Sequence, residues 1–299
     1  MENFYPVIIK KDGGIIHDIF ASSHNDLINK YLTLDEIAAE DFFVGQYCPK
    51  DGYRLDDIDN YTLLNNKIFF PDWFTGKLYK KVMAELKSII EAMIIKGRKK
   101  LLLHEGVILN KMTRVEEAKH CIVFAIYDEA SIDTIDETTV VKHMTDDAFI
   151  GTMKDGSKVE EMLGYAKIKT MRDYSKVVKM YGGAKIGEMY NYARIGVLKG
   201  DSNVLEMHDQ SKADRLKHLS RVDEMHNHTV IEEMWEWTIV EKMFDYARIN
   251  FMDEDSKVLE MFGDSMVEQM FGNSIVEKTY ENSLVRKLHD AAQVLSKEL

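Results

Sequence analysis

The sequence has very little proline or cysteine. Its three prolines, Pro6, Pro49 and Pro71, all lie near the N-terminus, so the chain from residue 72 onward contains none. Because proline cannot donate a backbone hydrogen bond, this absence permits an uninterrupted β-ladder over most of the chain. Two cysteines, Cys48 and Cys121, are too few for a disulfide framework, which favours a reducing compartment.

The sequence also lacks the features of secretion or membrane insertion. The first residues show no basic segment followed by an apolar one, and no stretch approaches the ~18 apolar residues of a membrane span. We therefore expect a cytoplasmic protein, in the cytosol of a host cell, without a membrane partner.

A nine-residue repeat begins at Cys121 and runs to about Asp290, in nineteen copies without an insertion or deletion. Position 1 is Ser, Ala or Thr except at Cys121, position 3 is Val or Ile except at Ala213, and position 6 is Met in thirteen copies. Small and β-branched residues two places apart share one face of a strand. Positions 7 to 9 are rich in Asp, Gly and Asn, which favour turns. Each copy is therefore predicted to be one strand and one corner of a parallel β-solenoid.

Residues eighteen apart match better than residues nine apart. Ala130, Ala148 and Ala166 alternate with Thr139 and Ser157 at position 1. Side chains that lie directly above one another share one environment, so this pattern predicts two copies, or about 18 residues, per coil. Nineteen copies would then give between nine and ten coils. Tandem duplication of an eighteen-residue unit is an alternative origin of the same pattern.

The rest of the chain is predicted to form a small α+β N-terminal module and two caps. Residues 1–100 form the module, with strands near 4–9, 15–20 and 42–47, a hairpin at 61–70, and helices near 24–31, after Thr33, and from about 75 to 96. Residues 101–120 are expected to cap the first coil, residues 121–290 to form the solenoid, and residues 291–299 to end it. The region from Arg286 to Leu299 is predicted to be a short capping helix.

Most of the net charge of −12 lies on the repeats, because residues 1–100 carry 14 basic and 15 acidic residues. Carboxylates recur between the β-branched residue and the methionine, and at least one of these two positions must face water. A repeating negative surface can compete for a protein site that normally binds phosphates. The predicted binding wall consists of Glu206, Asp223, Glu224, Glu232, Glu233, Glu241 and Glu260.

From Tyr190 onward, position 7 carries a ring in every second copy, which predicts an aromatic ladder formed by Tyr190, His208, His226, Phe244, Phe262 and Tyr280. The copies between them do not show this pattern. The ladder is either internal stacking or a ridge for a homodimer or another partner. His208, His226 and the nearby His228 are also candidate transition-metal ligands. We favour the ladder and expect no metal or other cofactor. A calcium β-roll or a hexapeptide-repeat acyltransferase is disfavoured, because neither the required corner motif nor an interrupting loop is present.

The repeats resemble uncharacterised phage and mobile-element proteins that repeat a Gly-Asn-Ser-x-Val-x-x-Met unit. The closest segment is Phe271-Gly272-Asn273-Ser274-Ile275-Val276-Glu277-Lys278, and Asp18–His24 and Pro71–Phe74 are similar to the opening module of such proteins. The architecture is also similar to pentapeptide-repeat solenoids, some of which imitate duplex DNA. The resemblance implies no catalytic residues.

These observations predict a non-catalytic, protein-binding solenoid rather than an enzyme. The sharper hypothesis is a phage-encoded, anti-defence inhibitor that acts as a DNA mimic on a host enzyme or defence complex and binds no nucleic acid itself. One alternative is a structural or assembly protein that oligomerises through the aromatic edge or the N-terminal module. A third is an enzyme with its site in that module, where His17-Asp18 and Ser22-Ser23-His24 supply nucleophile and base types.

Overall fold

The computed structural model describes residues 6–18, 21, 23–50, 54–65 and 69–298. Parts of the predicted strands 4–9 and 15–20, the candidate nucleophile Ser22 and the turn of the predicted hairpin lie outside the described residues. The chain divides into two compact units, Met1–Ile95 with Gly106–Ile108, and Lys96–Glu105 with Leu109–Leu299. Each unit is described here by itself.

The N-terminal unit is α+β, as predicted. Its antiparallel sheet has the order β2-β1-β3-β4, from β1 (Pro6–Lys10), β2 (Ile15–His17), β3 (Phe42–Pro49) and β4 (Tyr61–Asn65). Its helices are α1 (His24–Tyr31), α2 (Leu34–Ala39), η1 (Ile58–Asn60) and α3 (Gly76–Met93). Ile8, Leu27 and Leu32 form a buried core between sheet and helices, while α3 buries an apolar stripe of its own.

Local sequence signals explain where these helices begin. The Thr33 hydroxyl accepts a hydrogen bond from the Glu36 amide, and the Glu36 carboxylate accepts one from the Thr33 amide. This reciprocal pair is the predicted capping box. Thr75 likewise accepts from the Leu78 amide at the start of α3. The helices therefore start at polar residues that satisfy otherwise unpaired backbone donors.

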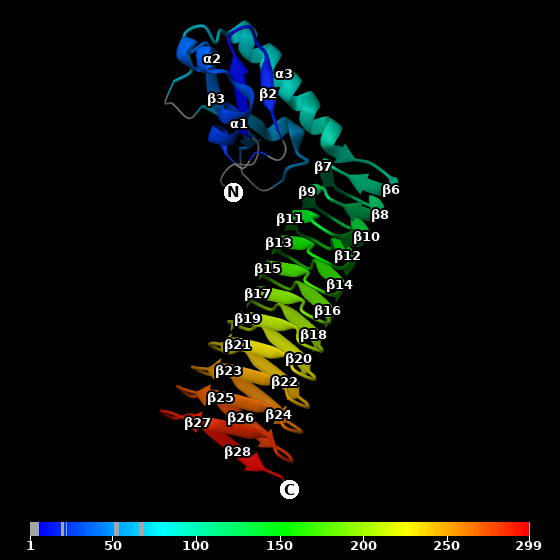
Figure 1. Ribbon diagram of the computed structural model, residues 1–299, viewed down its shortest axis with the longest axis vertical. Coiled ribbons are helices and arrows are strands. Elements are labelled where there is room, and N and C mark those ends of the chain that lie inside the picture. The colour runs from blue at the N-terminus through cyan, green and yellow to red at the C-terminus, as the bar shows by residue number, and fades with distance from the viewer. Residues whose placement is uncertain (1–5, 19–20, 22, 51–53, 66–68, 299) are drawn as a thin grey trace. The chain divides into compact units, whose positions relative to one another are not determined.

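The rest of the chain is a parallel β-solenoid with two flat sheets of twelve strands each (Figure 1). Strands alternate between the sheets, and from Ile122 onward each strand pairs with the strand eighteen residues further along the chain, as Ile132 pairs with Ile150. The predicted two-copy coil is confirmed. The odd sheet contains β5 (Ile94–Ile95), β7 (Gly106–Leu109), β9 (Ile122–Ile126), β11 (Val140–Met144), β13 (Lys158–Met162), β15 (Lys176–Met180), β17 (Arg194–Lys199), β19 (Lys212–Lys217), β21 (Val230–Met234), β23 (Arg248–Met252), β25 (Met266–Met270) and β27 (Leu284–Leu288). The even sheet contains β6 (Arg98–Leu103), β8 (Arg114–Lys119), β10 (Ser131–Asp136), β12 (Phe149–Met153), β14 (Lys167–Met171), β16 (Lys185–Met189), β18 (Asn203–Met207), β20 (Arg221–Met225), β22 (Ile239–Met243), β24 (Lys257–Met261), β26 (Ile275–Thr279) and β28 (Gln293–Lys297).

Strand β20 shows how each rung divides its side chains. Val222 and Met225 are fully buried between the sheets, whereas Arg221, Asp223 and Glu224 are partly exposed. Positions 4 and 5 thus both face outward, so each rung presents more polar surface than strict alternation would give. The buried methionines fill the space between the two sheets, where an unbranched side chain adapts to irregular gaps.

The solenoid begins earlier than predicted. The segment 101–120 does not form a separate cap, because Arg98–Leu103 and Arg114–Lys119 are already rungs of the even sheet. Val115 lies in register with Ile132, although the corner at His120 is one residue shorter than the corners that follow it. That missing residue shifts the repeat out of phase and hides the first coils from a nine-residue search.

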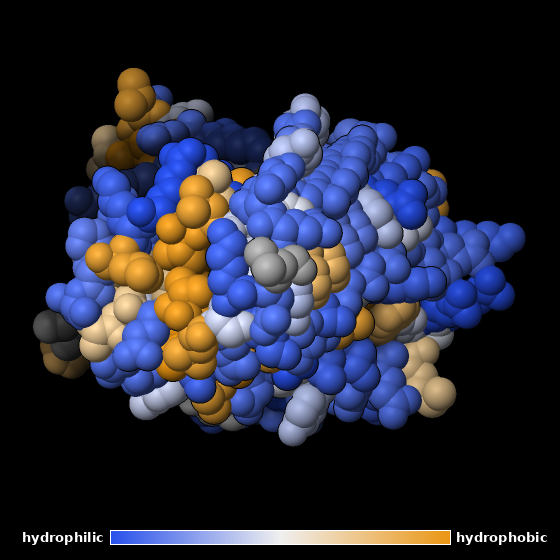
Figure 2. Space-filling model, turned by 90° about the horizontal axis from the view of Figure 1, so that it is seen from below, coloured by the Kyte–Doolittle hydropathy of each residue, from blue (hydrophilic) through white to orange (hydrophobic). Residues whose placement is uncertain are grey.

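The predicted C-terminal capping helix is wrong. Residues Gln293–Lys297 form strand β28, which pairs with β26 and places Val294 beside Val276. The nine-residue phase in fact continues beyond Asp290, with Ala292 at position 1 and Val294 at position 3. Figure 2 views the chain from its C-terminal end, where an apolar stripe lies between hydrophilic residues. The exposed apolar residues of this last coil are Leu284, Leu288 and Leu295.

Burial predicts the effect of truncating two side chains of β18. Met207 is fully buried, so Met207→Ala should lower the free energy of unfolding by about 2–5 kcal/mol through lost contacts and a cavity. Leu205, on the same strand, is 43% exposed, and Leu205→Ala should change it by less than about 0.5 kcal/mol. Denaturant unfolding followed by circular dichroism measures both. Equal effects of the two substitutions would contradict the assignment of inward and outward positions.

Candidate interaction surfaces

The corners are built from positions 7 to 9, and position 8 has a positive φ in every described copy. Asp209, Asn227 and Asp245 have φ values of 60°, 56° and 55°. Asp, Asn and Gly tolerate this conformation better than other residues. A hydrogen bond from the amide of Ala247 to the carbonyl of Phe244, at 3.0 Å, closes the turn. Glu also occupies position 8 in several copies, which indicates a second role for a carboxylate there.

That second role is a hydrogen bond between coils. The Asn191 amide donates to the Asp209 carboxylate at 3.0 Å, the Asp209 amide to the Asn227 side chain at 3.1 Å, and the Asn227 amide to Asp245 at 3.0 Å. In these coils the position 8 side chain thus satisfies the backbone donor of the coil before it, as Asp146 and Glu281 also do. Sequence reasoning recognised these residues only as turn formers.

The predicted aromatic ladder forms on the edge that follows the even-sheet strands, called here the aromatic edge (corners 136–138 to 280–282). Its six rings stack face to face, with neighbouring centroids 4.6–5.1 Å apart and interplanar angles of 5–10°. The rings are partly exposed, so the ladder lies on the outside of the solenoid and not in its core. Their faces contact one another, which leaves their edges available to solvent.

The two imidazoles within the ladder are held as stacked rings. His208 and His226 lie 4.8 Å apart, and their Nε2 atoms lie 2.9 Å from Glu206 and 3.2 Å from Glu224. The third candidate ligand, His228, stacks on Tyr246 at 5.0 Å. Within the described residues, no group of three or more His, Cys, Asp or Glu side chains is arranged to hold a metal ion. The geometry therefore supports the ladder interpretation of these histidines.

Two further aromatic groups were missed from the sequence. At position 9 of the aromatic edge, Tyr174 stacks on the exposed ring of Tyr192 at 5.2 Å. On the opposite edge, Phe251 stacks on Phe271 at 5.0 Å, although Phe251 stands at position 5 and not at position 7. Residues two places apart on a strand lie on one side, so pairing positions 5 and 7 is the signal that could have found this second stack.

The seven predicted wall carboxylates do not form one acidic surface. Five lie on the even sheet, whereas Glu232 and Glu233 lie on strand β21 of the odd sheet. Each also has a partner in a neighbouring side chain. The contacts are Glu206–His208, Asp223–Arg221, Glu224–His226, Glu224–Lys242, Glu232–Lys212, Glu233–Trp235, Glu241–Arg221 and Glu260–Lys278.

Acidity is concentrated on the two edges of the solenoid instead. The nineteen corners from Tyr127 to Ala291 carry eighteen acidic and four basic residues, whereas the strands between them carry fourteen acidic and seventeen basic residues. Corners are where the chain turns and where Asp and Glu serve the hydrogen bonds described above. The flat walls are consequently close to neutral, and the negative potential follows the edges.

The catalytic candidates of the N-terminal unit have structural partners. The Ser23 hydroxyl caps α1 by accepting the Asp26 amide at 3.2 Å, and His24 Nε2 lies 3.0 Å from the carbonyl oxygen of Gly45. Burial lowers the pKa of His17 below its ordinary value. These contacts give Ser23 and His24 structural roles, at the start of α1 and against strand β3. Their role in an enzyme stays a prediction.

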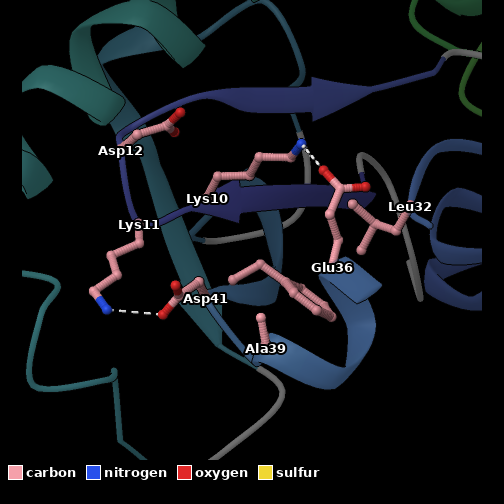
Figure 3. Close-up of a pocket in the computed structure, with 8 residues that line it drawn as sticks. Lys10, Lys11, Asp12, Leu32, Glu36, Ala39 and Asp41 are labelled. Carbon is pink, nitrogen blue, oxygen red and sulfur yellow. Dashed lines mark hydrogen bonds and ion pairs between the residues drawn. The ribbon is translucent and has the colours of Figure 1, made fainter. Parts of the chain in front are cut away.

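A cavity of about 560 Å³ opens between the end of β1 and helix α2 (Figure 3). Two ion pairs border it, Lys10–Glu36 at 2.7 Å and Lys11–Asp41 at 2.8 Å. Hydrogen bonds from Lys10 and Thr33 lower the pKa of Glu36 to about 2. Because Glu36 also closes the capping box of α2, its contacts are accounted for by the fold.

No helix in the described part of the chain combines the length and apolar character that crossing a membrane requires. Comparison with protein-family models, with curated proteins and with solved structures found no match for the chain. The interaction surfaces are therefore assigned from the geometry of this chain alone.

The hydrogen bond between coils predicts how Asp209 responds to substitution. Asp209→Ala removes the acceptor of the Asn191 amide and places alanine at φ 60°, so it should lower the free energy of unfolding by about 1–2 kcal/mol. Asp209→Asn should stay within about 0.5 kcal/mol of the wild type, because Asn227 fills the same role in the next coil. Thermal unfolding compares the two. A loss in Asp209→Asn equal to that in Asp209→Ala would contradict this role.

Proposed function

We propose that this protein is a non-catalytic binding rod whose acidic edges occupy the nucleic-acid-binding site of another protein and so inhibit it. The single observation that carries the proposal is the segregation of charge, with carboxylates gathered on the edges and neutral walls between them. The resemblance of the repeats to phage and mobile-element proteins is the only reason to place the partner in a host cell.

The acidic surface is strongest in the C-terminal coils. Corners from residue 208 to residue 291 carry nine acidic residues on the two edges against Lys217. Many of these carboxylates are held in place, because position 8 side chains are tied to the coil before them. Fixed charges lose less side-chain entropy on binding than mobile ones do. They also recur with the strand spacing of about 4.8 Å.

The charge density is adequate for this role but lower than that of DNA. The edges carry about one net negative charge per 3 Å of solenoid if the coils rise by about 4.8 Å each. Duplex DNA carries one per about 1.7 Å. Binding to a basic site should therefore depend on salt, with a shallower slope than DNA itself would show.

Neutralising edge carboxylates tests the proposal. Asp209→Asn, Asp245→Asn and Asp264→Asn together remove three edge charges, and asparagine retains the hydrogen bonds that Asp209 and Asp245 accept at position 8. Partners captured from the host extract on immobilised wild-type protein should be released by duplex DNA or by salt, and the triple variant should capture them at least about ten-fold less well.

A matched control removes three wall charges that are already paired, in Asp223→Asn, Glu232→Gln and Glu241→Gln. This variant should bind within about two-fold of the wild type, because exposed ion pairs contribute little. Capture that resists salt and is not competed by duplex DNA would exclude the acidic edges as the binding surface.

The second candidate function is assembly through exposed aromatic side chains. Tyr174, Tyr192 and Tyr246 on the aromatic edge are 70%, 49% and 57% exposed, and exposed apolar rows of this kind often mark interfaces. If they join two copies, light scattering should report a dimer whose dissociation constant rises at least about ten-fold in Tyr174→Ser/Tyr246→Ser. A strict monomer at high concentration would contradict this function.

A further inference from the structure

The coils in the middle of the solenoid are basic, in contrast to those before and after them. Residues 154–200 contain ten basic and five acidic residues. Some of these cations pair with carboxylates, as in Lys158–Glu160 and Lys179–Glu161. Among the described residues, five other lysines of this band have no ion-pair partner. They are Lys167, Lys169, Lys176, Lys185 and Lys199.

The same coils have an unusual corner on the edge that follows the odd-sheet strands, called here the glycine edge (corners 127–129 to 289–291). Position 8 is glycine in three consecutive coils, at Gly164, Gly182 and Gly200, with φ values of 63°, 65° and 72°. Elsewhere a side chain at this position can reach back to the coil before it. Here three successive coils provide none.

The consequence is a row of open backbone donors. In the part of the chain that the structure describes, the amides of Gly164, Gly182 and Gly200 have no hydrogen-bond acceptor. A Cβ built on Gly182 would lie 3.4 Å from the nitrogen of Gly164, and one built on Gly200 would lie 3.2 Å from the nitrogen of Gly182. The places left by the missing side chains of Gly182 and Gly200 therefore adjoin open amides, where an oxygen atom of a ligand can accept the hydrogen bond.

Aromatic and basic side chains border this row. The Tyr165 ring is 66% exposed and lies over Gly183, where an added Cβ would approach it to 2.9 Å. Lys167 and Lys185 lie three residues after Gly164 and Gly182 and occupy adjacent rungs, and Lys199 lies within the third corner. Asp201 and Glu161 are the nearest carboxylates in the sequence, and Glu161 is already paired with Lys179.

We propose that the glycine corner and its lysines bind a linear polyanion through its phosphate groups. Successive backbone amides combined with lysine ammonium groups are the donors with which proteins recognise phosphate oxygens. The amides recur with the spacing of the rungs, about 4.8 Å, so they can engage several groups along one chain at the same time. This site is separate from the acidic C-terminal edges and does not depend on the function proposed for them.

Gly182 is the position at which the site can be closed without disturbing the fold. A side chain there meets only ordinary contacts of 3.4 Å or more, and Asn227 and Asp245 already adopt the same backbone conformation. In Gly182→Asn the new amide oxygen can accept the hydrogen bond of Gly164, as Asn227 does for Asp209. This substitution therefore occupies the site without changing the charge.

The experiment is isothermal titration of the full chain with linear inorganic polyphosphate and, separately, with single-stranded oligothymidylate. Wild-type protein should bind at least one of them, and the two arms distinguish a polyphosphate from a nucleic acid as the source of the phosphates. Gly182→Asn should weaken the binding at least about ten-fold, and so should Lys167→Gln/Lys185→Gln. Circular dichroism should show that both variants retain the wild-type fold.

The control is Gly263→Asn, a position 8 glycine whose own amide is already bonded to Glu281 at 2.7 Å. It should bind as the wild type does. Absence of binding to both polyanions would overturn the proposal, as would equal affinity of Gly182→Asn and wild type. If Gly182→Asn loses its fold, the lysine variant decides the outcome, and its unchanged affinity would also overturn the proposal.

Discussion

The solenoid depends above all on its parallel backbone ladder. In this ladder, backbone amides and carbonyls of each strand hydrogen-bond to the strands one coil before and one coil after it. From Cys121 onward it keeps the coil at eighteen residues, because corners of equal length hold the same positions in register from rung to rung. The ladder also stacks equivalent positions of successive coils on one another. A residue type that recurs every eighteen positions therefore forms a column, as methionines do in the core, rings on the aromatic edge and carboxylates at the corners. The ladder has no place for proline, and none occurs after Pro71.

Columns of like-charged side chains repel one another, and the solenoid offsets this repulsion in different ways at its corners and on its walls. Stacked carboxylates repel one another, but at position 8 several of them, such as Asp146 and Asp209, accept a backbone amide from the neighbouring coil, which offsets part of that repulsion. On the walls, many carboxylates pair with lysine or arginine side chains of neighbouring rungs, as in the contacts between Lys142 and Glu160 and between Lys179 and Glu161. Charge is therefore balanced where the surface is flat and left unbalanced where the chain turns. The edges become the distinctive surfaces of the protein for this reason.

Positions at which a column is interrupted are also candidate functional positions. Three glycines in succession lack the acceptor that Asp146, Asp209 and Asp245 supply at the same position of other corners, and the lysine-rich coils coincide with that interruption. A similar effect operates at the C-terminal end, where the last rungs have a neighbour on one side only and Leu288 and Leu295 remain exposed. In a repeat protein, function is more easily placed at such departures than along the regular rungs, since the regular positions are already committed to pairing.

The fold class, the eighteen-residue coil, the aromatic ladder and the helix caps could be predicted without coordinates, because each depends on local chemistry. The solenoid has small and β-branched residues at fixed spacing and turn formers at position 8, and the cap of α2 has Thr33 with Glu36. The sequence could not place the first and last coils, where a shortened corner and an unfamiliar final copy concealed the phase. The folded chain was needed to show that the carboxylates of Glu206 and Glu232 lie on opposite walls and already have partners, and that the edges hold the unbalanced charge. Those properties depend on which side chains meet across coils, and residues eighteen apart in sequence become neighbours only when the ladder has formed.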